Sequence, residues 1–165
     1  MKKIGFIVVA LLMSIAANAQ FEQGKGYIGA SLSGLDISNQ NKEFHFGLNA
    51  RLGYMFEKNL MALGEVGYEH LGNNPDALVL GAGARYYIEQ NGLYLGAGLK
   101  FKHADTNYND LMPSVQLGYA FFLSRTVTLE PELYFDISTN KFDYTCYGLR
   151  VGIGVYLFKD QYMKR

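Results

Sequence analysis

The chain has 165 residues, and its 15 Lys and Arg balance its 15 Asp and Glu, so the formal net charge is zero. No block of basic residues occurs, which excludes a nucleic-acid-binding protein. Cys146 is the single cysteine, so no intramolecular disulfide can form. The 19 Gly, 13 Tyr and 11 Phe, with three Pro and no Trp, are typical of many short antiparallel strands.

The first element in chain order is an export signal, "MKKIGFIVVALLMSIAANAQ". Two lysines precede an apolar run, Ile4–Ala17, and Ala17-Asn18-Ala19 supplies a small-x-small cleavage site. The run of 14 residues is too short to span a bilayer as a helix. We therefore predict a cleaved signal peptide over residues 1–19 and one domain over residues 20–165, with a net charge of 13 − 15 = −2.

Downstream of the signal, apolar and polar residues alternate in segment after segment. The stretch "FHFGLNARLGYMF", residues 44–56, shows the pattern most clearly, because successive side chains of a strand point to opposite faces. Short and longer links between the segments alternate, as they must in an up-and-down meander. The pattern predicts eight strands near residues 24–35, 42–56, 60–70, 77–89, 93–102, 113–123, 126–137 and 144–158.

The two faces of these strands differ in charge. Over the second to eighth strands the apolar face carries no charged residue, whereas the other face carries glycines and ten charged residues. Glycine weakens a water-facing strand, but small residues make room for long ones inside a narrow barrel, and lipid tolerates no charge at mid-depth. We therefore predict an all-β, eight-stranded antiparallel up-and-down transmembrane β-barrel. Its lumen holds Arg51, Glu65, Glu69, Arg85, Lys100, Lys102, Glu130, Glu132, Asp136 and Arg150.

Register predicts partners for some of these charges, since an unpaired buried charge is costly. A turn at residues 57–59 gives opposed residue numbers a sum of 116, which places Arg51 opposite Glu65. A sum of 282 around residues 138–143 places Glu132 opposite Arg150. With opposite charges paired across so narrow a lumen, we expect a plugged barrel and no pore. Pro131, which lacks an N–H group, predicts a bulge or a skipped hydrogen bond in the seventh strand.

Aromatic residues on the apolar face gather toward both strand ends, as expected of two girdles at the membrane interfaces. The predicted girdle residues are Phe44, Phe46, Tyr54, Phe56, Tyr68, Tyr86, Phe101, Phe121, Phe135 and Tyr147.

This pattern over residues 24–158, together with the closing strand "YGLRVGIGVYLF", resembles the small OmpA/OmpX-like outer-membrane β-barrel proteins of diderm bacteria. The resemblance implies a location in the cell outer membrane, contact with its lipid, and recognition of the aromatic-ended last strand by the barrel assembly machinery. The loops are candidates for contact with lipopolysaccharide, host surfaces or another membrane protein. Closure leaves no strand edge that demands a partner, so we expect a monomer. The function predicted is structural or surface-interacting and non-enzymatic.

Two alternatives remain open from the sequence. A lipid-modifying enzyme could use residues of the longer connections, which contain His45, His70 and His103 beside Ser38, Asp76, Asp105 and Ser138. The histidines have no metal-ligand spacing, and no catalytic, cofactor or metal residue is assigned. A secreted, lipocalin-like barrel that binds a small apolar ligand would need the apolar row inside instead, and the chain has no Trp for the Gly-x-Trp signature of such proteins.

Overall fold

The computed structural model describes residues 21–36, 46–70, 76–88, 92–104, 108–140 and 145–157. The predicted signal peptide, residues 1–19, lies outside the described residues. The regular secondary structure in these ranges is β-strand. The described residues contain no helix that is long and apolar enough to cross a membrane.

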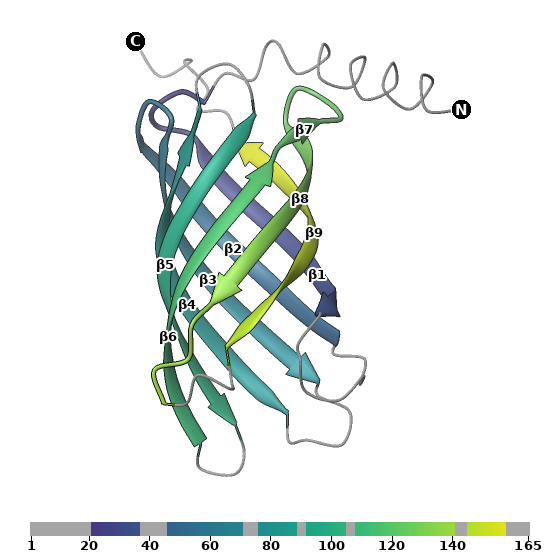
Figure 1. The fold of residues 1–165 in the computed structure, drawn as a ribbon. Coiled ribbons are helices and arrows are strands. Elements are labelled where there is room, and N and C mark those ends of the chain that lie inside the picture. The colour runs from purple at the N-terminus through teal and green to yellow at the C-terminus, as the bar shows by residue number, and fades with distance from the viewer. Residues whose placement is uncertain are drawn as a thin grey trace, which may run out of the picture.

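The strands form one antiparallel sheet that closes on itself (Figure 1). Hydrogen-bonded neighbours follow the order β6-β5-β4-β3-β2-β1-β9-β8-β7, and an additional β6–β8 pairing completes the ring. Because β6 and β7 occupy one position in the ring, the predicted eight-stranded up-and-down barrel is confirmed. The strands are β1 (Gly26–Asp36), β2 (Phe46–Glu57), β3 (Leu60–His70), β4 (Ala77–Tyr87), β5 (Leu93–Ala104), β6 (Tyr108–Tyr119), β7 (Phe121–Phe122), β8 (Val127–Asp136) and β9 (Cys146–Leu157).

The predicted registers are observed on both sides of the ring. Arg51 pairs with Glu65 across β2 and β3, and Glu132 pairs with Arg150 across β8 and β9. The β2–β3 register shifts by one residue only next to the turn, between Met55 and Glu57. Register holds because a one-residue slip would turn every side chain of a strand to the wrong face.

The sixth strand differs from the prediction. It begins at Tyr108, five residues before the predicted start at 113, and it breaks after Tyr119. The segment before residue 113 is polar, and its composition therefore predicts a loop. In the structure Asp110 points into the barrel, where Ser138 Oγ donates a hydrogen bond to its carboxylate at 2.5 Å. A polar residue on the inward face is compatible with a strand here, because the inside supplies its partner.

The break coincides with Pro131 on β8. The N–H of Ile137 donates to Pro113 and the N–H of Leu123 donates to Val127, so odd-numbered residues of β8 direct their backbone groups toward β6 and β7. Pro131 is odd-numbered and has no N–H to offer. Pairing stops beside it, after Glu132, and resumes at Leu129 in the same register.

The β8–β9 ladder, by contrast, runs through Pro131 without a register shift. Of the two predicted forms, a bulge or a skipped hydrogen bond, the structure therefore shows the skipped bond, on the β6–β7 side.

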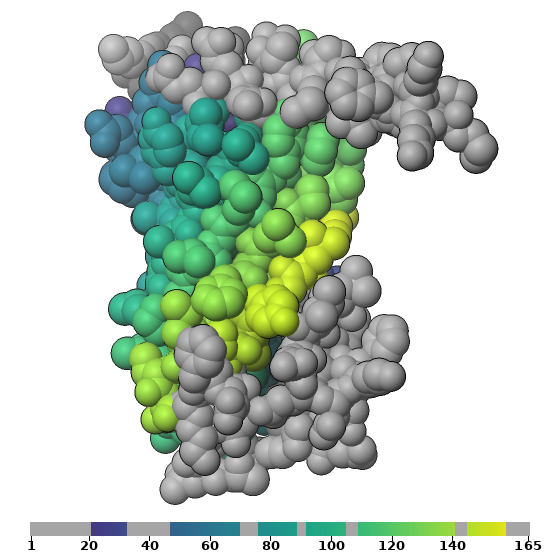
Figure 2. Space-filling model, viewed as in Figure 1, coloured from purple at the N-terminus to yellow at the C-terminus, as the bar shows by residue number. Residues whose placement is uncertain are grey.

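The apolar row faces outward. Leu52 is 65% exposed and its neighbours along the row are similarly open, whereas the inward-facing Arg85 is 0% exposed. The outer wall is continuous over the strands seen in Figure 2, with β8 and β9 crossing it obliquely in green and yellow. This orientation overturns the soluble, lipocalin-like alternative, which needs the apolar row inside.

Candidate functional site: the charged lumen

The centre of the lumen is organised around the carboxylate of Glu132. Arg51 donates to both of its oxygens, at 2.9 and 2.8 Å, in a bidentate arrangement. Arg85 Nη2 donates to Oε2 at 3.1 Å and the Tyr94 hydroxyl donates to the same oxygen at 3.0 Å. Arg150 Nη1 lies 3.5 Å from Oε1. Three guanidinium groups from three strands therefore converge on one buried carboxylate.

Glu130, two residues earlier on the same inward face of β8, anchors the neighbouring layer. Its carboxylate accepts hydrogen bonds from Arg85 Nη1 at 2.9 Å, from the Tyr27 hydroxyl at 2.8 Å and from Thr128 Oγ1 at 2.8 Å. The Arg85 guanidinium also lies 3.9 Å from the centre of the Tyr94 ring, which is a cation–π distance. Arg85 thus links the two carboxylates of β8 to the aromatic side chains around them.

Glu65 joins the centre to the other side of the lumen. Arg51 Nε donates to Glu65 Oε2 at 3.1 Å, which is the pair predicted from register. Arg150 Nη1 donates to Oε1 at 3.2 Å, and Lys100 Nζ lies 3.7 Å from the same oxygen. Lys100 in turn donates to Asp136 Oδ2 at 2.7 Å.

Nearer the long connections, Lys102 and Glu69 form the most exposed pair among the ten predicted lumen charges. Lys102 Nζ donates to Glu69 Oε2 at 2.6 Å, and the two side chains are 15% and 32% exposed. Each of the ten charged residues predicted to face the lumen thus has an opposite charge within 4 Å. The five positive and five negative charges balance, as burial demands.

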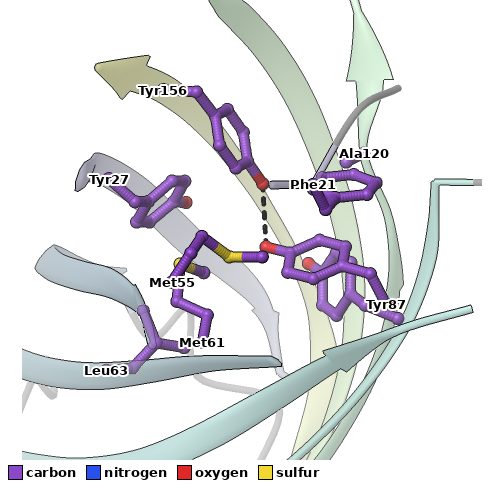
Figure 3. Close-up of a cluster of buried hydrophobic side chains, with 9 residues drawn as sticks. Phe21, Tyr27, Met55, Met61, Leu63, Tyr87, Ala120 and Tyr156 are labelled. Atoms are coloured by element: carbon purple, nitrogen blue, oxygen red, sulfur yellow. Dashed lines mark hydrogen bonds between the residues drawn. The ribbon is translucent and has the colours of Figure 1, made fainter. Parts of the chain in front are cut away.

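A cluster of aromatic and apolar side chains lies inside the barrel (Figure 3). It lies toward the end with the short turns, where β4 ends at Tyr87 and β9 ends at Leu157. It contains four tyrosines, and we call it the aromatic cluster. The hydroxyl oxygens of Tyr87 and Tyr156 are 2.8 Å apart. The Tyr27 hydroxyl donates to Glu130, and the Tyr94 hydroxyl donates to Glu132. The cluster comprises Phe21, Tyr27, Met55, Met61, Leu63, Tyr87, Tyr94, Ala120 and Tyr156, with Phe122 packed against it.

This cluster was not predicted from the sequence. The signal for it was present, because Tyr87, Tyr94 and Tyr156 all fall on the inward face of their strands close to short turns. The inward glycines make room for these rings: a Cβ at Gly118 would overlap the Tyr94 ring, and one at Gly29 would overlap the Tyr27 ring.

Comparison with known proteins agrees with this architecture. The family model described as "Outer membrane protein beta-barrel domain" matches residues 6–161. The chain belongs to this family. Its location is therefore the outer membrane. No curated protein matches the sequence.

Three solved barrels show the same fold at low sequence identity. The N-terminal β-barrel domain of Pseudomonas aeruginosa OprF aligns over 82% of this chain and 98% of its own, with 14% identity and a TM-score of 0.65. Neisserial surface protein A aligns over 81% and 97%, with 16% identity and a TM-score of 0.62. Yersinia pestis Ail in a phospholipid nanodisc aligns over 82% and 100%, with 12% identity and a TM-score of 0.54.

The predicted girdle residues of this outer membrane protein are placed on the outside where their side chains are described. Phe44 lies outside the described residues, and so does the side chain of Phe46. Phe121 is half-buried, with its ring 4.3 Å from that of Tyr119. The exposed members are Tyr54 and Phe56 of β2, Tyr68 of β3, Tyr86 of β4, Phe101 of β5, Phe135 of β8 and Tyr147 of β9.

The structure describes only some of the residues that the sequence offered for an enzymatic site. His45, Ser38 and Asp105 lie outside the described residues, and so does the side chain of His70. His103 is exposed, with Nδ1 2.6 Å from Asn109 Oδ1. Asp76 accepts a hydrogen bond from the Tyr68 hydroxyl. Among the described residues no group of His, Cys, Asp or Glu could hold a metal ion.

Proposed function

We propose that this outer membrane protein is a non-enzymatic, structural barrel with a sealed lumen, which presents its longer connections for surface contact. The observation that carries the proposal is the convergence of Arg51, Arg85 and Arg150 on Glu132 at the centre of an eight-stranded barrel. A barrel of this size is only wide enough for its own side chains to fill. Opposite charges that satisfy one another here leave no path for ions.

The same proposal assigns the contacts of the outer surface. The aromatic residues at both ends of the outward face anchor the barrel at the two lipid interfaces, and the longer connections face the lipopolysaccharide side. The closing strand β9 is the segment that the barrel assembly machinery reads. Because β1 and β9 pair over most of their length, no strand edge is left open, which supports a monomer. Nucleic acid is not among the expected partners.

Electrical recording tests whether the lumen is closed to ions. The protein, folded in detergent and inserted into planar bilayers, is expected to give no stepwise current above that of the lipid alone. Folding is verified on the same samples by a heat-dependent shift on a detergent gel, which reports a closed barrel. Discrete conductance steps from gel-verified protein would contradict the sealed lumen.

Incubation with lipopolysaccharide tests the absence of enzymatic activity. Mass spectrometry of the lipid A is expected to show no change in acyl chains after incubation with the folded protein. Loss or gain of an acyl chain with folded but not with boiled protein would favour the lipid-modifying alternative.

A further inference from the structure

The short segment before β1 runs beside the end of β2 to the barrel mouth. Phe21 is only 3% exposed, although it lies outside the sheet. Its ring stacks on Tyr87 with centroids 3.8 Å apart and an angle of 18° between the planes. It also approaches Tyr156 at 5.7 Å and Phe122 at 5.8 Å, so it touches side chains from β4, β7 and β9. Figure 3 shows the Phe21 ring beside Tyr87 and Tyr156.

Backbone hydrogen bonds hold the segment in this position. The N–H of Asn59 in the β2–β3 turn donates to Phe21 at 3.1 Å. The N–H of Gly24 donates to Met55 at 2.7 Å, and the N–H of Met55 donates to Lys25 at 2.9 Å. Gly24 has a φ of 88°, a left-handed conformation that glycine adopts without strain. These bonds continue the alignment of β1 with β2, so the segment runs on to the β2–β3 turn and places Phe21 at the barrel mouth.

Phe21 forms the outermost layer of the aromatic cluster. Tyr87 is the last residue of β4 and Tyr156 is the last but one of β9, so both lie where the wall of the barrel ends. A ring that rests on these two tyrosines therefore covers the mouth at the short-turn end. Beneath it, Met55 and Met61 are fully buried.

We propose that residues 21–25 are a stopper that closes the short-turn mouth, separate from the charged network deeper in the lumen. The inference rests on the proposed sealed lumen and adds a second barrier to it. The stopper is tied by a few turn hydrogen bonds and one stacked ring instead of a continuous ladder. Segments held in this way open locally at lower free energy than the strands, so the stopper can leave the mouth while the barrel stays closed.

Thiol accessibility tests the stopper in the full-length protein folded in detergent. Cys146→Ser removes the native thiol, and Met61→Cys places a reporter beneath Phe21. With Phe21 present, a charged methanethiosulfonate reagent is expected to react slowly. Phe21→Ala is expected to raise the labelling rate at least tenfold, whereas Phe21→Tyr, which keeps the ring, restores protection.

Phe56→Ala is the matched control, because Phe56 lies at the same end but points outward. It is expected to leave labelling unchanged. Folding of each variant is verified by the heat-dependent gel shift, and Leu63→Cys serves as the reporter if Met61→Cys does not fold. Fast labelling with Phe21 intact, or slow labelling in folded Phe21→Ala, would overturn the stopper. Neither result depends on conductance, so the stopper can fail while the sealed lumen stands.

Discussion

Substitution of Glu132 by Gln is the sharpest test of the charged network. Gln keeps the volume of the side chain but removes the negative charge on which Arg51, Arg85 and Arg150 converge. The variant leaves the three guanidinium groups with one fewer counter-charge in a part of the lumen closed to solvent. Removing one partner of a buried ion pair costs about 3–5 kcal/mol, because the other charge is left buried and uncompensated.

Glu69→Gln is the matched control. It makes the same chemical change in the same lumen, but Glu69 and Lys102 are partly open to solvent, at 32% and 15% exposure. Pairs of this kind contribute about 0–1 kcal/mol. At about 1.4 kcal/mol per power of ten, the central substitution is expected to reduce the folding equilibrium constant by roughly two to three powers of ten more than the control.

Urea unfolding in lipid vesicles measures the difference. The chain has no Trp and 13 Tyr, so tyrosine fluorescence and far-ultraviolet circular dichroism are the appropriate signals. Both variants are compared with the wild type by the midpoint and slope of the transition. If Glu132→Gln lowers the free energy of unfolding by no more than Glu69→Gln, the central carboxylate does not hold the network together.

Three further predictions follow from register and packing. Arg51→Glu is expected to lower the free energy of unfolding of the barrel, and an added Glu65→Arg should recover only part of the loss. Recovery is partial because the carboxylate at position 51 would also face the carboxylate of Glu132. Full recovery in a double-mutant cycle by urea unfolding would show that the Arg51–Glu65 pair acts alone. Pro131→Val supplies the missing N–H and should add about 0.5–1.5 kcal/mol to the free energy of unfolding, with slower amide exchange beside the gap; unchanged exchange would count against the explanation given for the break. Gly83→Ala should cost about 1–3 kcal/mol, because its Cβ would lie 2.6 Å from the carbonyl oxygen of Ala97, whereas Gly81→Ala, with a nearest contact of 3.4 Å, should cost less; equal costs in thermal unfolding would refute the steric argument.

The alternation of apolar and polar residues along the strands alone predicted the fold and the direction in which each charged side chain points. Arg51 and Glu65 flank a short turn, so the turn and the two-residue period together determine their register. A register shifted by one residue would place one of the charges in lipid, where it costs about 2–4 kcal/mol. The same reasoning located Glu132 opposite Arg150, although the connection between those strands is longer.

Alternation could not predict which side chains meet across the lumen. The bidentate partner of Arg51 is Glu132, 81 residues away on a strand that is not its neighbour. The two-residue period of a strand determines which face of the sheet a side chain is on. Which side chains meet across the lumen depends on the curvature of the sheet and on the stagger of the strands. Phe21 was missed for a related reason, since it precedes the first predicted strand and its ring meets Tyr87 and Tyr156 only across the barrel mouth.

The pairing of β1 with β9 has a consequence for how the protein is made. Gly26 lies beside Leu157, so the first strand to leave the ribosome can complete its hydrogen bonds only when the last has arrived. Until then β1 and β8 each keep an open edge, and each unpaired backbone group in hydrocarbon costs several kcal/mol. Insertion one strand at a time would accumulate that cost, whereas closure removes it in a single step. We therefore expect closure of this barrel to be all-or-none, and a chain interrupted before β9 to gain almost nothing from the seven strand positions it already has.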